Sequence, residues 1–272
     1  MKTNKLNPMW TYTIAAYLAF WAIVLVLGGL ASMVFDAPPA VMTGITILGS
    51  WSPTIVLLLM LRKLKPGLTI KGFYKQAFHD RLKPSLVLAV PIIVFGILLA
   101  AAWAASLVQG TALADQVAVP SALGLVVLLT VFQGPSGEES GWRGYLRPEL
   151  EGRYGFTRGN VILGLVWAFW HAPLWLVASD YAGAEALVYV VANIVVLTAL
   201  TLIMGVFMRR CDNLFLAFWI HFCFNVSLRL FTGDIRFFVF LSVLYAVVAL
   251  GLLPSMRRTS QSPVMVSARS RA

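Results

Sequence analysis

The chain has 272 residues, of which 60% are hydrophobic and only 12% charged, and its formal net charge at neutral pH is +10. A soluble domain has roughly 45–50% apolar and about 25% charged residues, so this composition excludes an ordinary water-soluble protein and indicates helices embedded in lipid. The positive charge would suit nucleic acid in a soluble protein. Here membrane topology explains it better, and we expect no nucleic-acid partner.

Eight apolar stretches predict about eight transmembrane helices, because roughly 20 apolar residues cross a hydrocarbon core about 30 Å thick. The first stretch is longer than the apolar part of a signal peptide, so we expect it to be a retained helix. The sequence therefore predicts an all-α, polytopic integral membrane protein. In chain order, the predicted spans are 10–35, 40–61, 85–108, 121–139, 160–179, 186–208, 214–231 and 237–253.

The distribution of positive charge predicts the orientation of these spans. If the N-terminus is cytoplasmic and the spans alternate, 19 of the 21 Lys and Arg residues face the cytoplasm, and only Arg229 and Arg236 lie outside. Positive residues collect on the cytoplasmic side of membrane proteins. We therefore expect both termini in the cytoplasm and the protein in the plasma (cytoplasmic) membrane.

Residues 1–254 are expected to form a single transmembrane helical domain, with its functional core at about 120–230. The segment 255–272 is basic and lacks an apolar pattern, so we expect a disordered cytoplasmic tail. The basic, aromatic loop 62–84 either sets the topology or lies along an anionic leaflet. The two cysteines, Cys211 and Cys223, lack the spacing of a zinc site and are expected to be free thiols.

Few polar side chains fall inside the predicted spans. Each ionisable group at membrane depth costs about 2.5–3.5 kcal/mol on insertion scales, so those that are retained indicate a functional site. His79 lies outside the spans and is expected to be an ordinary surface residue, and the single Asn of the sixth span is expected to bond a neighbouring helix. The polar residues of the spans are Glu138, Glu139, His171, Asn193, His221 and Asn225.

The spacing of these residues predicts how they cooperate. Arg143 follows Glu139 by four residues, so the two side chains can pair on one helical face. This pairing would leave Glu138 free to act as a general base. Asn225 follows His221 by the same spacing, which places two hydrogen-bonding groups on one face of the seventh span.

Two tryptophans have the same spacing relative to the polar groups. Trp142 lies four residues after Glu138, and Trp167 lies four residues before His171. Because residues four apart are neighbours on an α-helix, we expect both indole rings to line the substrate pocket and exclude water from it.

Three motifs occur in order on three separate predicted spans. They are Glu138-Glu139-x-x-x-Arg143, Trp167-x-x-x-His171 and His221-x-x-x-Asn225. This arrangement resembles the CAAX-protease and bacteriocin-processing family of intramembrane endopeptidases, which includes the Rce1-type enzymes. The resemblance covers residues 120–230, about 40% of the chain. Trp167 stands where the family commonly has phenylalanine, which keeps an aromatic wall.

The resemblance implies an endopeptidase that hydrolyses a peptide bond near the cytoplasmic leaflet. Its implied substrate is a membrane-anchored or lipidated peptide, as in prenylated CAAX proteins. Aimed donors at the oxyanion of such a reaction are worth about 10²–10³ in rate each. The implied catalytic groups are Glu138 and His171 for activating water, His221 and Asn225 for the oxyanion, and Glu139 and Arg143 for orienting the site.

The residues leave the choice between a metal-free and a zinc mechanism open. Water activated by a glutamate needs no cofactor, and we prefer this mechanism. Zinc held by Glu138, His171 and His221, with a fourth position for water, is the alternative. The chain lacks His-Glu-x-x-His, which argues against zinc.

Two non-enzymatic interpretations are also considered. The polar cluster could bind protons or substrate in a transporter, or the chain could be a catalytically silent relative with an immunity or scaffold role. The sequence has no inverted repeat, which argues against a transporter. Its motifs are intact, which argues against a silent relative.

Overall fold

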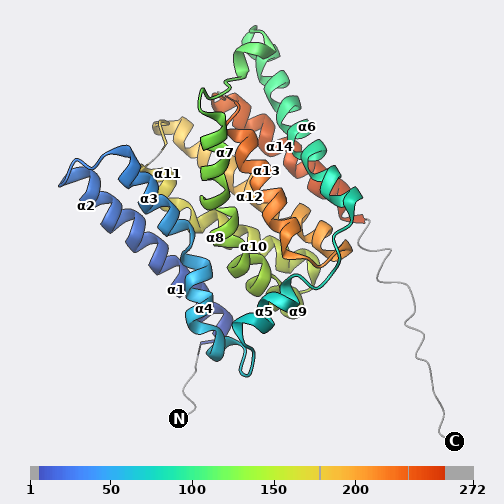
Figure 1. Ribbon diagram of the computed structural model, residues 1–272. Helices are drawn as coiled ribbons and strands as arrows, with labels where there is room; N and C mark the ends of the chain where they lie inside the picture. Colours follow the sequence, from blue (N-terminus) through green and yellow to red (C-terminus); the bar gives the residue numbers. More distant parts are fainter. Residues whose placement is uncertain (1–5, 178, 232, 255–272) are drawn as a thin grey trace, which may run out of the picture.

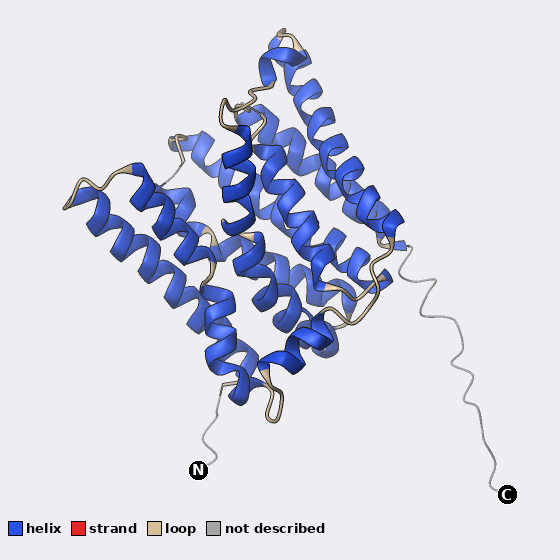
Figure 2. Cartoon of the chain, viewed as in Figure 1, coloured by secondary structure: helices blue, strands red, loops and turns tan. Residues whose placement is uncertain are grey.

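Helices make up 82% of the computed structural model, which describes residues 6–177, 179–231 and 233–254. No β-strand occurs in these ranges, where an isolated β-bridge joins Val117 to Phe231. The prediction of an all-α fold is therefore confirmed (Figure 2). The predicted tail at 255–272 lies outside the described residues.

Five helical stretches in the described part of the chain are long and apolar enough to cross a membrane. Their bounds are α1 (Pro8–Trp21), a π-helical segment (Ala22–Leu27) and α2 (Gly28–Met33) for the first, α3 (Pro39–Ser50) and α4 (Ser52–Leu64) for the second, then α6 (Pro84–Gln109), α12 (Gly183–Arg210) and α14 (Ile235–Leu252). These stretches correspond to the predicted first, second, third, sixth and eighth spans. The chain is an integral membrane protein, as its composition predicts.

The other three predicted spans are built from shorter helices. They are α7 (Leu123–Phe132) with α8 (Pro135–Glu139), α10 (Phe156–Trp170) with α11 (Ala172–Val177), and α13 (Leu214–Leu228). α13 has 15 residues, about 22 Å of helix, which is shorter than a hydrocarbon core of about 30 Å. The count of eight spans and their orientation therefore stay predictions.

The helix that carries the two carboxylates does not end at Glu139, as the span 121–139 predicts. It continues as the π-helical segment η3 (Ser140–Leu146) and then as α9 (Arg147–Tyr154). Gly137 explains its path, because a Cβ at this position would lie 2.6 Å from the backbone oxygen of Ser50. The absence of a side chain lets the helix pack closely against the α3–α4 junction. The carboxylates consequently lie in the interior and not at a helix end.

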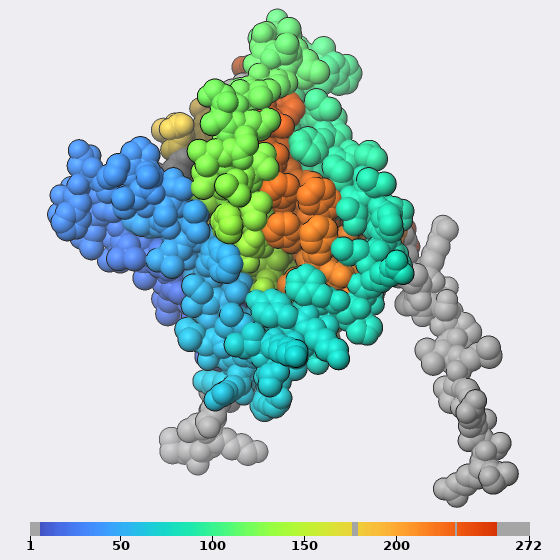
Figure 3. All heavy atoms as spheres, in the orientation of Figure 1, coloured from blue at the N-terminus to red at the C-terminus, as the bar shows by residue number. Residues whose placement is uncertain are grey.

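The helices form two groups on either side of this carboxylate helix (Figure 1). On one side, α1 packs against α4. On the other, α12 contacts both α10 and α14, and α6 contacts α13 and α14. α8 contacts both α4 and α13, so it links the two groups. In Figure 3, the surface of α13 is visible between α6 and α7.

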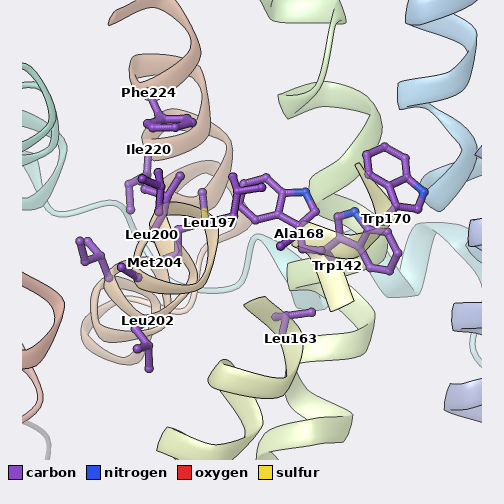
Figure 4. Packing of buried hydrophobic residues seen from close by; sticks show 14 of the residues in the cluster. Trp142, Leu163, Ala168, Trp170, Leu197, Leu200, Leu202, Met204, Ile220 and Phe224 are labelled. Atoms are coloured by element: carbon purple, nitrogen blue, oxygen red, sulfur yellow. The ribbon is translucent and has the colours of Figure 1, made fainter. Parts of the chain in front are cut away.

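Large apolar side chains fill the interior around the carboxylate helix (Figure 4). The rings of Trp142, from η3, and Trp170, from α10, meet edge to face with their centroids 5.8 Å apart. Leu200 of α12 and Ile220 of α13 belong to the same buried cluster. This packing surrounds the polar side chains with apolar atoms and strengthens the electrostatic interactions between them.

Two short helices lie in the connections between the long ones. α5 (Ile70–Ala77) joins α4 to α6, and a 3-10 helix (Leu113–Gln116) follows α6. The side-chain oxygen of Thr69 accepts a hydrogen bond from the backbone N–H of Gly72 at 3.0 Å and so caps the start of α5. The buried Phe73 and the half-buried Tyr74 face η3.

Polar contacts join two connections and the start of α9 (Arg147–Tyr154) at the end of the bundle near α5. Asp80 Oδ2 accepts a hydrogen bond from the backbone N–H of Asp212 at 2.6 Å, and Asn213 Nδ2 donates to the backbone oxygen of Asp80 at 2.7 Å. Arg147 Nη2 reaches Asp212 Oδ1 at 2.6 Å. The Asp212 N–H, together with His79, holds the pKa of the Asp80 carboxyl below its ordinary value. We refer to Asp80, Arg147, Asp212 and Asn213 as the loop clasp.

Candidate active site

Glu138 and Glu139 lie on α8, one turn after a break in the backbone. Gly134 has φ 114° and ψ −84°, a conformation that favours glycine, and Pro135 follows it. The backbone oxygen of Gly134 accepts from the N–H of Glu138 at 2.9 Å, which starts the new helix. Both glutamate side chains are buried, with 3% and 2% of their surface exposed. Since neither is at the surface, each needs a partner within the protein.

Glu139 is the centre of a buried ionic network. Its Oε1 accepts from Arg143 Nη1 at 3.1 Å and from His221 Nδ1 at 2.7 Å. Arg143 Nη2 in turn donates to Thr201 Oγ1 of α12 at 2.9 Å. The network joins the carboxylate helix (α8 and η3) to α12 and α13, which lie much later in the sequence. The pairing of Glu139 with Arg143 is the one expected from their spacing.

Glu138 takes a different partner from its neighbour. Its Oε2 accepts a hydrogen bond from the indole Nε1 of Trp167 at 2.6 Å. The guanidinium of Arg143 stacks 4.0 Å from the centre of the same indole ring, a favourable contact between a cation and an aromatic face. Trp167 is fully buried. It therefore lies beside Glu138 and orients that carboxylate, and its role in lining a substrate pocket stays a prediction.

His171 directly follows the last residue of α10, with one ring nitrogen committed and the other free. Its Nδ1 lies 2.8 Å from the backbone oxygen of Trp167. A carbonyl oxygen only accepts hydrogen bonds, so Nδ1 carries a hydrogen and the lone pair of neutral His171 is on Nε2. The rings of His171 and Trp167 meet edge to face, with their centroids 5.5 Å apart. This histidine thus presents an acceptor next to the indole that holds Glu138.

Three of the predicted functional groups face one small volume beside Gly134. A Cβ on Gly134 would lie 3.0 Å from Asn225 Nδ2, 3.1 Å from His221 Nε2 and 3.3 Å from Glu138 Oε1. Asn225 Nδ2 also donates to the backbone oxygen of Gln133 at 3.4 Å. The backbone break therefore brings α8 and α13 together at their polar residues, with no side chain between them.

Trp142 lies elsewhere, although its spacing from Glu138 predicts a shared face. Its ring contacts Tyr12, with centroids 6.0 Å apart, and Trp170. Trp142 is thus directed toward α1 and α10, and its ring does not pair with Glu138. Arg143, in the same π-helical segment, keeps its contact with Glu139 four residues earlier.

The other two polar residues discussed in the sequence analysis, Asn193 and His79, have local partners. Asn193 donates to the backbone oxygen of Tyr189 at 2.8 Å, one turn earlier on α12. His79 contacts Asp80 in the exposed connection after α5. Neither residue contacts the buried network.

Two residues that the sequence did not single out belong to the site. Gly134 precedes a proline, and Gly-Pro is a recognised signal for a chain break, so its position could have been inferred. Thr201 is one of several polar residues in the 28-residue helix α12. Its role depends on packing between helices, which no local pattern indicates.

Groups of three or more His, Cys, Asp or Glu side chains that could hold a metal are absent from residues 6–177, 179–231 and 233–254. The bonds of Glu138, His171 and His221 engage Oε2, Nδ1 and Nδ1, respectively. The choice between a metal-free and a zinc mechanism stays a prediction.

Comparison with known proteins identifies the region that contains these residues. Residues 120–227 match the family of type II CAAX prenyl endopeptidases described as Rce1-like. A curated protein named CAAX prenyl protease 2, from Methanococcus maripaludis, is 30% identical over 144 residues, which are 49% of this chain and 51% of the relative. The chain thus spans about half the length of the curated relative it matches. The family resemblance drawn from the motifs is confirmed.

Proposed function

We propose that this chain, whose residues 120–227 belong to the Rce1-like family of type II CAAX prenyl endopeptidases, is an intramembrane endopeptidase. The observation that carries the proposal is the convergence of Glu138, His221 and Asn225 beside Gly134. Hydrolysis of a peptide bond needs a group that accepts a proton from water and donors for the negative oxygen that forms. Glu138 can be the acceptor, and the nitrogens of His221 and Asn225 can be the donors. The family match favours this function over the transporter and scaffold interpretations.

In the proposed reaction, Glu138 removes a proton from a water molecule, and the water oxygen forms a bond to the carbonyl carbon of the substrate. His171 assists as a second acceptor through Nε2. Trp167 keeps Glu138 in place through its hydrogen bond to Oε2, which leaves Oε1 to receive the proton. The same carboxyl then delivers the proton to the leaving amine as the C–N bond breaks.

His221 and Asn225 stabilise the negative oxygen that forms during the attack. Asn225 donates through Nδ2. His221 Nδ1 is held 2.7 Å from Glu139 Oε1, and its Nε2 donates when both ring nitrogens carry hydrogen. Arg143 balances the charge of Glu139, so the network supports the donor without adding net negative charge.

We propose a membrane-anchored peptide as the substrate, by analogy with the name of the archaeal relative. A prenylated C-terminal segment fits, since its lipid would remain in the bilayer while the peptide reaches the buried carboxylates. We propose an entry on the cytoplasmic side of the plasma membrane, which the positive-inside distribution of Lys and Arg supports. We prefer a mechanism with no metal, because the glutamate pair and its partners supply both a base and donors.

The test is cleavage of a fluorogenic prenylated peptide by the full-length protein in proteoliposomes. Glu138→Gln keeps the size of the side chain and removes the base, and His171→Ala removes the second acceptor. Both should lower kcat by about 10²-fold or more. Addition of a zinc chelator to the wild-type protein should leave the rate unchanged.

Asn193→Ala serves as the matched control, because Asn193 is also a polar residue within a long apolar helix but bonds only to its own helix. It should cleave the peptide at the wild-type rate. Unchanged cleavage by both Glu138→Gln and His171→Ala, with thermal unfolding like the wild type, would overturn the proposed function.

A further inference from the structure

A cavity of about 900 Å³ lies between the end of α4 and the start of α5, away from the carboxylates. Its walls are of two kinds. Leu58, Leu59 and Ile70 supply apolar surface, and Arg62 and Lys71 supply positive charge. Leu59 is 81% exposed and Ile70 is 50% exposed, although both are large apolar side chains. The cavity is therefore open to its surroundings on an apolar side.

The two cations of this cavity lack acidic partners. Among the described residues, no carboxylate lies within the 4.0 Å of an ion pair from Arg62 or Lys71, whereas the nearby Lys65 pairs with Glu149. No Asp or Glu lines the cavity. Two unbalanced positive charges at one opening attract an anionic group.

The order of these residues along α4 places the charges at the membrane surface. Leu58 and Leu59 lie on the last turns of a stretch long and apolar enough to cross a membrane, and Arg62 follows one turn later. Basic side chains at the end of such a helix reach the level of the lipid headgroups. The apolar wall faces the acyl chains, and the cations lie beside the phosphates.

We propose that this cavity binds one anionic phospholipid, with its phosphate between Arg62 and Lys71 and an acyl chain along Leu58, Leu59 and Ile70. An amphiphile fits where a free anion does not, because a free phosphate would leave the apolar wall uncovered. The charge of the loop 62–84 thus serves a defined lipid site in addition to topology.

The lipid site is connected to the carboxylate helix through α5. Tyr74 of α5 has its hydroxyl 3.2 Å from Ser140 Oγ, and a Cβ on Gly144 would lie 2.9 Å from the ring of Phe73. Both η3 residues follow the glutamates on the same helix. A lipid that holds the start of α5 therefore stabilises the helix that carries Glu138, and we expect it to raise the melting temperature.

The experiment measures lipid binding to the full-length protein in phosphatidylcholine nanodiscs titrated with phosphatidylglycerol. Bound lipid is counted by native mass spectrometry, and thermal unfolding is followed in parallel. The double variant Arg62→Gln/Lys71→Gln should bind phosphatidylglycerol about 30-fold more weakly, since two basic contacts at an anionic surface are removed. Its melting temperature should no longer rise with the anionic lipid.

The matched control is Lys63→Gln/Lys75→Gln, which removes the same charge from exposed positions that do not line the cavity. It should keep binding within about threefold of the wild type. Inorganic phosphate and glycerol phosphate should not compete. Equal losses in the two double variants, full competition by inorganic phosphate, or no preference of the wild type for phosphatidylglycerol over phosphatidylcholine would each overturn the proposal. No readout depends on peptidase activity.

Discussion

The helices that bear the polar site and those around them differ in continuity. α6 and α12 run for 26 and 28 residues, and their exposed side chains are mostly apolar. The α7–α8 pair is broken at Gly134, and α10 ends at Trp170, directly before His171. Non-helical backbone at membrane depth is tolerated only where protein surrounds it. The helix breaks and the polar residues therefore lie together in the protein interior, and the continuous helices separate them from lipid.

The largest effect on stability is expected at the buried Arg143. Arg143→Ala removes the charge that balances Glu139 and leaves a buried carboxylate, so the free energy of unfolding should fall by about 3–5 kcal/mol. Thermal unfolding of the purified protein in detergent, followed by tryptophan fluorescence, measures the change. Arg158→Ala, at an exposed position, should change it by less than about 0.5 kcal/mol. Equal effects of the two variants would contradict a central role for the network.

The break itself is tested at Gly134. Gly134→Ala places a methyl group 3.0–3.3 Å from three functional atoms in a conformation that disfavours side chains, so peptide cleavage should fall by about 10²-fold. Gly110→Ala is the control, because Gly110 also has a positive φ but has open space around it. It introduces the same kind of backbone strain without a contact with the site. Gly110→Ala should keep the cleavage rate. Wild-type cleavage by Gly134→Ala would show that the volume beside it is not used.

A smaller effect is expected where a continuous helix meets the network. Thr201→Val keeps the shape of the side chain and removes the acceptor for Arg143, so unfolding should become easier by about 1–2 kcal/mol. Thr198→Val is the control on the same helix, since the Thr198 hydroxyl has no hydrogen-bond partner in the described structure. Stability measurements by thermal unfolding should separate the two variants. A loss at Thr198 as large as that at Thr201 would argue against the specific contact.

The smallest effect is expected on the outer face of a continuous helix. Ile92 of α6 is 73% exposed, and within the bilayer this face would contact lipid. Ile92→Ala should therefore change the free energy of unfolding by less than about 0.5 kcal/mol. A melting temperature as low as that of Thr201→Val would mean that this face of α6 packs against protein. The proposed separation between lipid-facing continuous helices and the polar interior would then be wrong at α6.

The sequence predicts those parts of the site that depend on position along one helix. The pairing of Glu139 with Arg143 follows from their spacing and is observed at 3.1 Å. The same spacing does not bring Trp142 to Glu138, because the indole ring packs against Tyr12 and Trp170. Spacing along a helix predicts which side chains can meet, and packing against other helices decides which of them do.

Contacts between helices are outside the reach of such patterns. The bonds from His221 to Glu139 and from Trp167 to Glu138 join residues 82 and 29 positions apart. They depend on how α13 and α10 pack against the carboxylate helix, and the Gly-Pro break lets α8 approach α13 closely. Composition predicted the all-α membrane fold, since the class depends on total apolar content and not on these contacts.

The loop clasp has a consequence for the order in which the protein is made. Asp80 and Asp212 are 132 residues apart, so a growing chain has already inserted α6 and most of α12 when the second partner leaves the ribosome. Until then, the polar contacts of the early segments with later ones at this end include those of Lys65 with Glu149 and of Tyr74 with Ser140. The clasp therefore forms only after α12 has been made, and of the described helices α13 and α14 follow it in the sequence.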